Sequence, residues 1–128
     1  MLVSYNYLPL DQKWLHFSQV KNLLKHDQDV SITFDAHDQI IKCREFLDQK
    51  MAQKDKNYYG INTGFGFLQN ITIDDSQIEQ LQYNLIVSHA CGLGEQVPEP
   101  IVKLMLMLKI KSLSYGYSGV QIETVKRL

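Results

Sequence analysis

The sequence has few of the residues that build disulfide scaffolds or metal centres. Its 128 residues include only two cysteines, Cys43 and Cys91, and no CxxC pair. Because the two cysteines lie far apart in the chain, they favour reduced, buried thiols of a cytoplasmic protein over a disulfide or a metal site. No set of His, Cys, Asp and Glu has the spacing of metal ligands, so we expect no metal.

An excess of charge of one sign and a long hydrophobic run are also missing. The formal net charge is −1, which gives no reason to expect a nucleic acid or an acidic membrane as partner. The most apolar stretch, residues 101–113, contains three lysines and cannot span a bilayer. The first residues show no basic leader followed by an apolar run, so no secretory signal is visible. We therefore expect a cytoplasmic location.

Apolar residues recur at helical spacing over most of the chain, and the composition is that of a globular domain, with 45% hydrophobic and 21% charged residues. The fold class predicted is α+β, mainly helical with a few short strands, in one domain over residues 1–128. The final helical pattern has no stop signal, which is expected of a truncated chain; a helix that frays at a natural terminus is the alternative. Helices are expected over residues 18–25, from a cap at Asp35 to about 51, and from a cap at Asp74 or Asp75 to about 86. A further helix is expected over residues 101–114, with Pro98 and Pro100 at its start and Gly116 as its C-cap, and a last one from residue 121 onward. Strands are expected at residues 30–34 and within residues 67–73.

The helix expected over residues 101–114 is apolar on nearly every side. This pattern predicts a buried helix. It also exceeds what one small domain can cover, so we expect an exposed apolar surface on part of it.

The stretch YYGINTGFGF, residues 58–67, combines three glycines with four aromatic rings and no charge. A phosphate-binding loop is the weakest interpretation, because the GxxxGxG spacing fits neither a Walker loop nor a dinucleotide-binding fingerprint. A strand is expected next, so no helix N-terminus follows that could bind an anion. A wide surface turn would use the glycines for positive φ. A mobile loop that closes over a ligand and delivers a phenol would also use this combination.

Three blocks of sequence together resemble one enzyme family. YGINTGFG, residues 59–66, resembles the signature loop of the aromatic amino acid ammonia-lyases. LQYNLIVSHACGLGE, residues 81–95, and LMLMLKIKSLSYGYSGV, residues 104–120, resemble later blocks of the same family in the same order. The match covers about the last seventy residues. The chain is thus similar to the N-terminal domain of that fold without its central helical bundle.

The resemblance implies a catalytic role for one tyrosine. The family removes ammonia from an aromatic amino acid with an electrophilic methylidene-imidazolone, which forms from an internal Ala-Ser-Gly. Tyr59 matches the residue assigned as the base, whereas Tyr58 has no implied role and is expected to pack or to anchor the loop. A free phenol has a pKa near ~10, so this role needs a site that favours phenolate. The tripeptide Ala-Ser-Gly does not occur in this chain.

The resemblance also implies substrate-binding residues. Ser88 and His89 are similar to the pair found in histidine-specific members, which implies that His89 contacts the imidazole of L-histidine. A structural hydrogen bond at a helix end is the alternative for His89. His16, His26 and His37 are expected to be solvated. The lid loop that the resemblance implies comprises Gly60, Asn62, Thr63, Gly64, Phe65 and Gly66.

Three functions follow from these observations. The first is the N-terminal part of a lyase that, when complete, deaminates L-histidine to urocanate and ammonia in histidine catabolism. Such an enzyme would be a homotetramer with active sites at subunit interfaces, and this chain alone would be inactive. The second is a free-standing, non-catalytic domain that binds a partner or an aromatic ligand. The third is a lyase or aminomutase of the same family that acts on phenylalanine or tyrosine.

Overall fold

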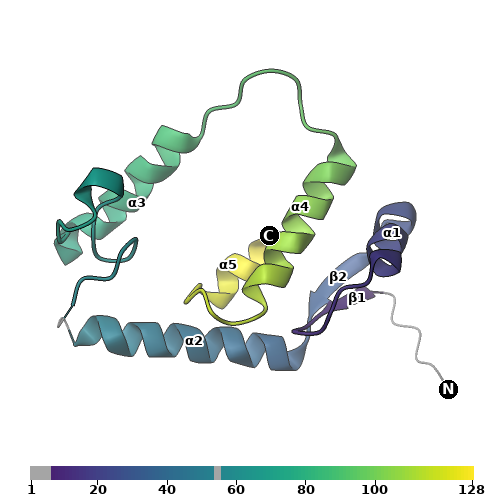
Figure 1. Cartoon of the computed structure of the whole chain (residues 1–128), viewed down its shortest axis with the longest axis horizontal. Coiled ribbons are helices and arrows are strands. Elements are labelled where there is room, and N and C mark those ends of the chain that lie inside the picture. The colour runs from purple at the N-terminus through teal and green to yellow at the C-terminus, as the bar shows by residue number, and fades with distance from the viewer. Residues whose placement is uncertain (1–6, 54–55) are drawn as a thin grey trace. The chain divides into compact units, whose positions relative to one another are not determined.

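The computed structural model describes residues 7–53 and 56–128 (Figure 1). Its contacts divide the chain into two compact units. The first unit joins Met1–Ala52 to Val97–Leu128, and the second is Gln53–Gln96. The first unit is therefore built from both ends of the chain.

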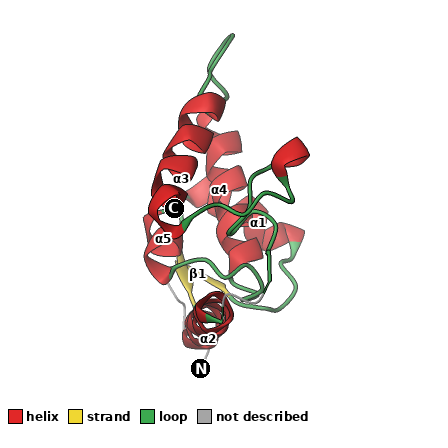
Figure 2. Ribbon diagram, turned by 90° about the vertical axis from the view of Figure 1, so that its left-hand side faces the viewer, coloured by secondary structure: helices red, strands yellow, loops and turns green. Residues whose placement is uncertain are grey.

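Helices are the main regular structure of the chain, as the red ribbons of Figure 2 show, and the only sheet in the described residues has two strands. The predicted α+β class with mainly helical content is confirmed. The first unit contains β1 (Tyr7–Leu10), α1 (Phe17–His26), β2 (Asp29–Ile32), α2 (Phe34–Ala52), α4 (Glu99–Leu113) and α5 (Ile122–Arg127), and the second contains the short 3-10 helix η1 (Gly66–Leu68) and α3 (Asp75–His89).

The two strands are parallel, with Leu8 opposite Val30 and Leu10 opposite Ile32. In β1 the leucines are buried while Tyr7 and Pro9 are exposed, which is the alternation of a strand with one covered face. The sequence pattern predicted β2 but not β1. The core of the first unit consists of Leu8, Leu10, Leu23, Ile40, Met107, Ile110, Leu113 and Val125.

Two predicted helix caps are wrong. α2 begins at Phe34, and the N–H of Ala36 donates to the Thr33 hydroxyl at 3.3 Å, so Thr33 occupies the position that was expected for Asp35. At the end of α4 the C-cap is Ser114, two residues before Gly116. Gly116 has a φ of 71°, and a Cβ there would lie 2.9 Å from the backbone of Gln39. The glycine is needed because the chain turns closely against α2.

α4 is buried on one side only, so it is less buried than its apolar sequence predicted. Met107, Ile110 and Leu113 lie in the core. The opposite side is apolar and exposed, which confirms the expected apolar surface. We call this surface the α4 apolar face; it consists of Ile101, Val102, Met105, Leu106 and Leu108.

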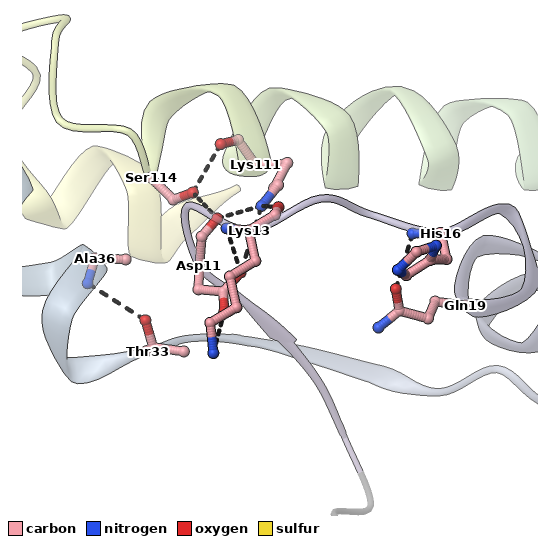
Figure 3. Close-up of polar contacts among 8 residues, drawn as sticks. All are labelled: Asp11, Lys13, His16, Gln19, Thr33, Ala36, Lys111 and Ser114. Atoms are coloured by element: carbon pink, nitrogen blue, oxygen red, sulfur yellow. Dashed lines mark hydrogen bonds and ion pairs between the residues drawn. The ribbon is translucent and has the colours of Figure 1, made fainter.

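A buried lysine connects α4 to the segment that follows β1 (Figure 3). Lys111 is only 8% exposed, and its ammonium donates to the backbone carbonyls of Asp11 and, at 2.6 Å, of Lys13. The Asp11 carboxylate lies 3.6 Å away. Ser114 adds a hydrogen bond of 3.2 Å to the Asp11 carbonyl. These partners compensate the burial of the charge and fix the segment after β1 to α4.

The second unit has little core of its own. Among its described residues, only Thr63 and Gly64 are buried. The apolar side chains of α3 that face inward, such as Ile78, Leu81 and Leu85, are half-buried. This unit therefore depends on its hydrogen bonds more than the first unit does.

Two features are absent from the described part of the chain. No helix in residues 7–53 and 56–128 is long and apolar enough to cross a membrane. No group of three or more His, Cys, Asp or Glu side chains is placed to hold a metal ion in this part of the chain.

Candidate functional site

Asn62 organises the glycine-rich loop of the second unit. Its side-chain oxygen accepts the backbone N–H of Tyr58 at 2.7 Å, and its side-chain nitrogen donates to the carbonyl of Lys56 at 3.1 Å. The backbone N–H of Asn62 also donates to the Tyr58 carbonyl at 3.2 Å. The side chain thus closes a turn over residues 58–62.

A second set of bonds ties the loop to the segment before α3. The N–H of Gly64 donates to the Ile71 carbonyl at 3.1 Å, and the N–H of Ile73 donates to the Asn62 carbonyl at 3.0 Å. Thr63 and Thr72 form a single antiparallel bridge. The strand predicted within residues 67–73 is wrong, because residues 66–68 form η1 instead. A tight turn at this point lets the chain reverse and pair with its own loop.

The three glycines of the loop are needed for different structural reasons. Gly60 and Gly66 have φ angles of 75° and 55°, in the left-handed region that glycine adopts most readily. At Gly64 a Cβ would lie only 2.6 Å from the Cβ of Leu68. The glycine positions are therefore those of a surface turn with one close approach. Their role in a lid stays a prediction.

Tyr59 projects from this loop. Its side chain is 64% exposed, and its ring meets that of Phe65 edge to face at 6.0 Å between centroids. Within the described part of the chain, its hydroxyl has no hydrogen-bond partner. Tyr58, by contrast, is half-buried. The structure leaves the Tyr59 phenol accessible, and its role as a base stays a prediction.

Ser88 and His89 lie together at the end of α3. The Ser88 hydroxyl donates to the Leu85 carbonyl at 3.0 Å and lies 3.1 Å from Nδ1 of His89. The same Nδ1 lies 2.8 Å from the Leu85 carbonyl. The cap is formed by the next residue, Ala90, whose N–H donates to Ile86 at 2.8 Å. His89 therefore makes a hydrogen bond to the Leu85 carbonyl at the end of the helix, which was the structural alternative for this residue. Its contact with substrate stays a prediction.

The structure does not join Tyr59 to His89. The loop is tied to Ile73, directly before α3, whereas His89 is the last residue of that helix. None of the hydrogen bonds, ion pairs or ring contacts of the described residues connects the loop with His89. The two predicted residues are therefore held by separate local networks.

The remaining candidate side chains differ in exposure from what was expected. Cys43 is half-buried and accepts the N–H of Gly119 at 3.3 Å, but Cys91 is exposed, so the prediction of two buried thiols is wrong for Cys91. Both are free thiols. His16 and His26 are exposed as expected, whereas His37 is half-buried on α2.

The individual role of Asn62 was not predicted from the sequence. An asparagine in a glycine-rich segment commonly bonds its own backbone and stabilises a turn, so its residue type was the available signal. Its partners at Tyr58 and Lys56 could not be read from the pattern.

The chain is similar to known proteins over nearly all its length. A family model described as aromatic amino acid lyase matches residues 15–128. A histidine ammonia-lyase of Deinococcus radiodurans is 43% identical over 114 residues, which are 89% of this chain and 22% of that protein. A histidine ammonia-lyase of Legionella pneumophila is 40% identical over 115 residues, again 89% of this chain and 22% of that protein. The chain thus spans about a fifth of the length of these curated relatives.

Solved structures show the same fold. Histidine ammonia-lyase from Trypanosoma cruzi is 32% identical with a TM-score of 0.78, over 93% of this chain and 22% of that one. The ergothioneine-degrading enzyme ergothionase from Treponema denticola is 27% identical with a TM-score of 0.85, over 94% of this chain and 24% of that one. Because the family model covers most of its residues, this chain belongs to the aromatic amino acid lyase family.

Proposed function

We propose that the chain is the N-terminal part of a histidine ammonia-lyase, which converts L-histidine to urocanate and ammonia in histidine catabolism. The observation that carries the proposal is the 43% identity to the histidine ammonia-lyase of Deinococcus radiodurans. The pair Ser88 and His89 supports the choice of substrate, because it resembles the histidine-specific pattern. Solved structures of the same fold include enzymes with other substrates, so the fold alone does not select L-histidine.

The residues of this chain would act before and during proton removal. Tyr59, on the loop that Asn62 organises, would take the proton from the β-carbon of the substrate. His89 would hold the imidazole ring, and the loop would exclude water. General-base catalysis of this kind typically contributes roughly 10²–10⁴-fold.

The methylidene-imidazolone of the family does not fit the residues present. It is made from Ala-Ser-Gly, and the chain's three alanines precede His37, Gln53 and Cys91. We therefore assign no step through that group to this chain. The 128-residue chain alone is expected to release no urocanate. A cytoplasmic location and a homotetramer of the complete enzyme are further parts of the proposal, by family resemblance.

A chimera tests the function directly. Residues of this chain replace the 114-residue aligned segment of the Deinococcus radiodurans relative, and urocanate is followed by its ultraviolet absorbance. We expect the chimera to deaminate L-histidine and to leave L-phenylalanine and L-tyrosine nearly untouched. The parent enzyme serves as positive control. A folded, assembled chimera that is inactive on L-histidine but active on another aromatic amino acid would overturn the substrate assignment.

The alternative function is a free-standing domain that binds a partner or an aromatic ligand. A folded, assembled chimera without activity on any of the three amino acids would favour it. Steady turnover by the 128-residue chain itself would contradict the expected inactivity.

A further inference from the structure

Three polar atoms meet at the end of α3: the Leu85 carbonyl oxygen, the Ser88 hydroxyl oxygen and Nδ1 of His89. The three distances between them are 3.0, 3.1 and 2.8 Å. Ser88 and His89 are three and four residues after Leu85, and side chains at these spacings point back over the preceding turn. The helix itself therefore brings them to one carbonyl.

The three contacts are satisfied only when Nδ1 of His89 carries a proton. A carbonyl oxygen can only accept, so the 2.8 Å contact requires a proton on Nδ1 of His89. The Ser88 hydroxyl donates its own proton to the same carbonyl and has lone pairs left to face Nδ1–H. Without a proton on Nδ1, two lone pairs would face each other at 2.8 Å, which is unfavourable.

We propose that Ser88 is a positioning residue which, together with the Leu85 carbonyl, holds neutral His89 in the Nδ1–H tautomer. In this tautomer Nε2 carries a lone pair and no proton. Nε2 has no partner among the described residues, and the side chain is exposed. His89 thus presents a hydrogen-bond acceptor, whereas neutral histidine in water more commonly has its proton on Nε2.

The tautomer decides which ring His89 can recognise. An acceptor at Nε2 matches a ligand ring that offers an N–H, such as the imidazole of L-histidine. An aromatic ring with only C–H groups would leave that acceptor unpaired, which is the kind of mismatch that gives strong discrimination. This substrate part of the inference rests on the proposed function, while the tautomer itself does not.

Nitrogen-15 spectroscopy of the 128-residue chain measures the tautomer. Long-range proton–nitrogen correlations are recorded at a pH where the imidazoles are neutral, and His89 is assigned by the signal that a His89→Gln variant loses. We expect a protonated-type shift for Nδ1 of His89 and an unprotonated-type shift for Nε2. His26 is exposed and has no partner among the described residues, so it supplies the ordinary mixture of tautomers. An averaged His89 signal like that of His26 would overturn the tautomer.

Two variants test Ser88. Ser88→Ala removes the hydroxyl, and we expect the His89 nitrogen shifts to move toward those of His26. Ser88→Thr keeps a hydroxyl that can bond the same carbonyl, so the shifts should stay as in the parent. Circular dichroism checks that both variants keep the helix. Unchanged shifts in Ser88→Ala would overturn the role of Ser88. These measurements do not depend on turnover. An inactive chimera would therefore contradict the proposed function without affecting the tautomer assigned to His89.

Discussion

At the scale of single residues, adjacent tyrosines provide a matched pair. Tyr59 is exposed with a free hydroxyl among the described residues, and Tyr58 is half-buried. In the chimera, Tyr59→Phe keeps the ring and loses the proton acceptor, so we expect kcat to fall roughly 10²–10⁴-fold with KM nearly unchanged. Tyr58→Phe should retain turnover. Steady-state kinetics with L-histidine decide the matter, and normal turnover in Tyr59→Phe would remove Tyr59 from the mechanism.

At the scale of elements, the glycine-rich loop depends on one close approach. An added Cβ at Gly64 would lie 2.6 Å from the Cβ and 2.8 Å from the carbonyl oxygen of Leu68. Gly64→Ala should therefore displace η1 and weaken the bonds of the Gly64 and Ile73 amides by about 1–3 kcal/mol. Gly92→Ala is the control, because a Cβ there meets nothing within 4 Å.

Amide hydrogen exchange of the 128-residue chain measures this effect. Faster exchange at Ile73 in Gly64→Ala, with no change in Gly92→Ala, is the expected result. Equal exchange in both variants would mean that the loop adapts without cost.

The elements also show which parts of the fold a sequence can predict. α1, α2, α3, α4 and α5 were predicted because helical periodicity is local, although the caps predicted for α2 and α4 were wrong. β1 was missed because its four residues become a strand only by pairing with β2, at a register where Tyr7 meets Asp29. The strand expected within residues 67–73 failed because η1 turns the chain at residues 66–68, and of the β-branched residues that follow only Thr72 forms a β-bridge.

The candidate site was also predictable from the sequence only in part. Tyr59, Ser88 and His89 were found through motifs, but the contacts that hold them were not. The bond between His89 and Leu85 is local in sequence, yet the choice between it and solvent depends on the rotamer. The bonds of Asn62 to Tyr58 and Lys56 require the turn that they themselves stabilise.

At the scale of the first unit, Lys111 connects segments about a hundred residues apart. Its ammonium bonds two backbone carbonyls of the segment after β1. Lys111→Met keeps most of the apolar stem and removes these bonds, so we expect the free energy of unfolding to fall by about 1–3 kcal/mol. Lys109→Met is the matched control, because Lys109 is exposed on the same helix without a partner in the described residues.

Urea denaturation of both variants, followed by circular dichroism, gives the comparison. A larger loss of stability in Lys109→Met than in Lys111→Met would contradict the role of the buried lysine.

At the scale of the whole molecule, the α4 apolar face leaves several large side chains in water. Met105 is 62% exposed at its centre, while Met107, two residues along, is 2% exposed in the core. An apolar surface of this kind favours association, so we expect the 128-residue chain to form oligomers as its concentration rises. Met105→Lys should shift sedimentation toward the monomer and keep the helical signal, because a lysine there can extend into solvent. Met107→Lys places the same charge in the core and should unfold the first unit. A parent chain that stays monomeric at every concentration would show that this face does not drive association.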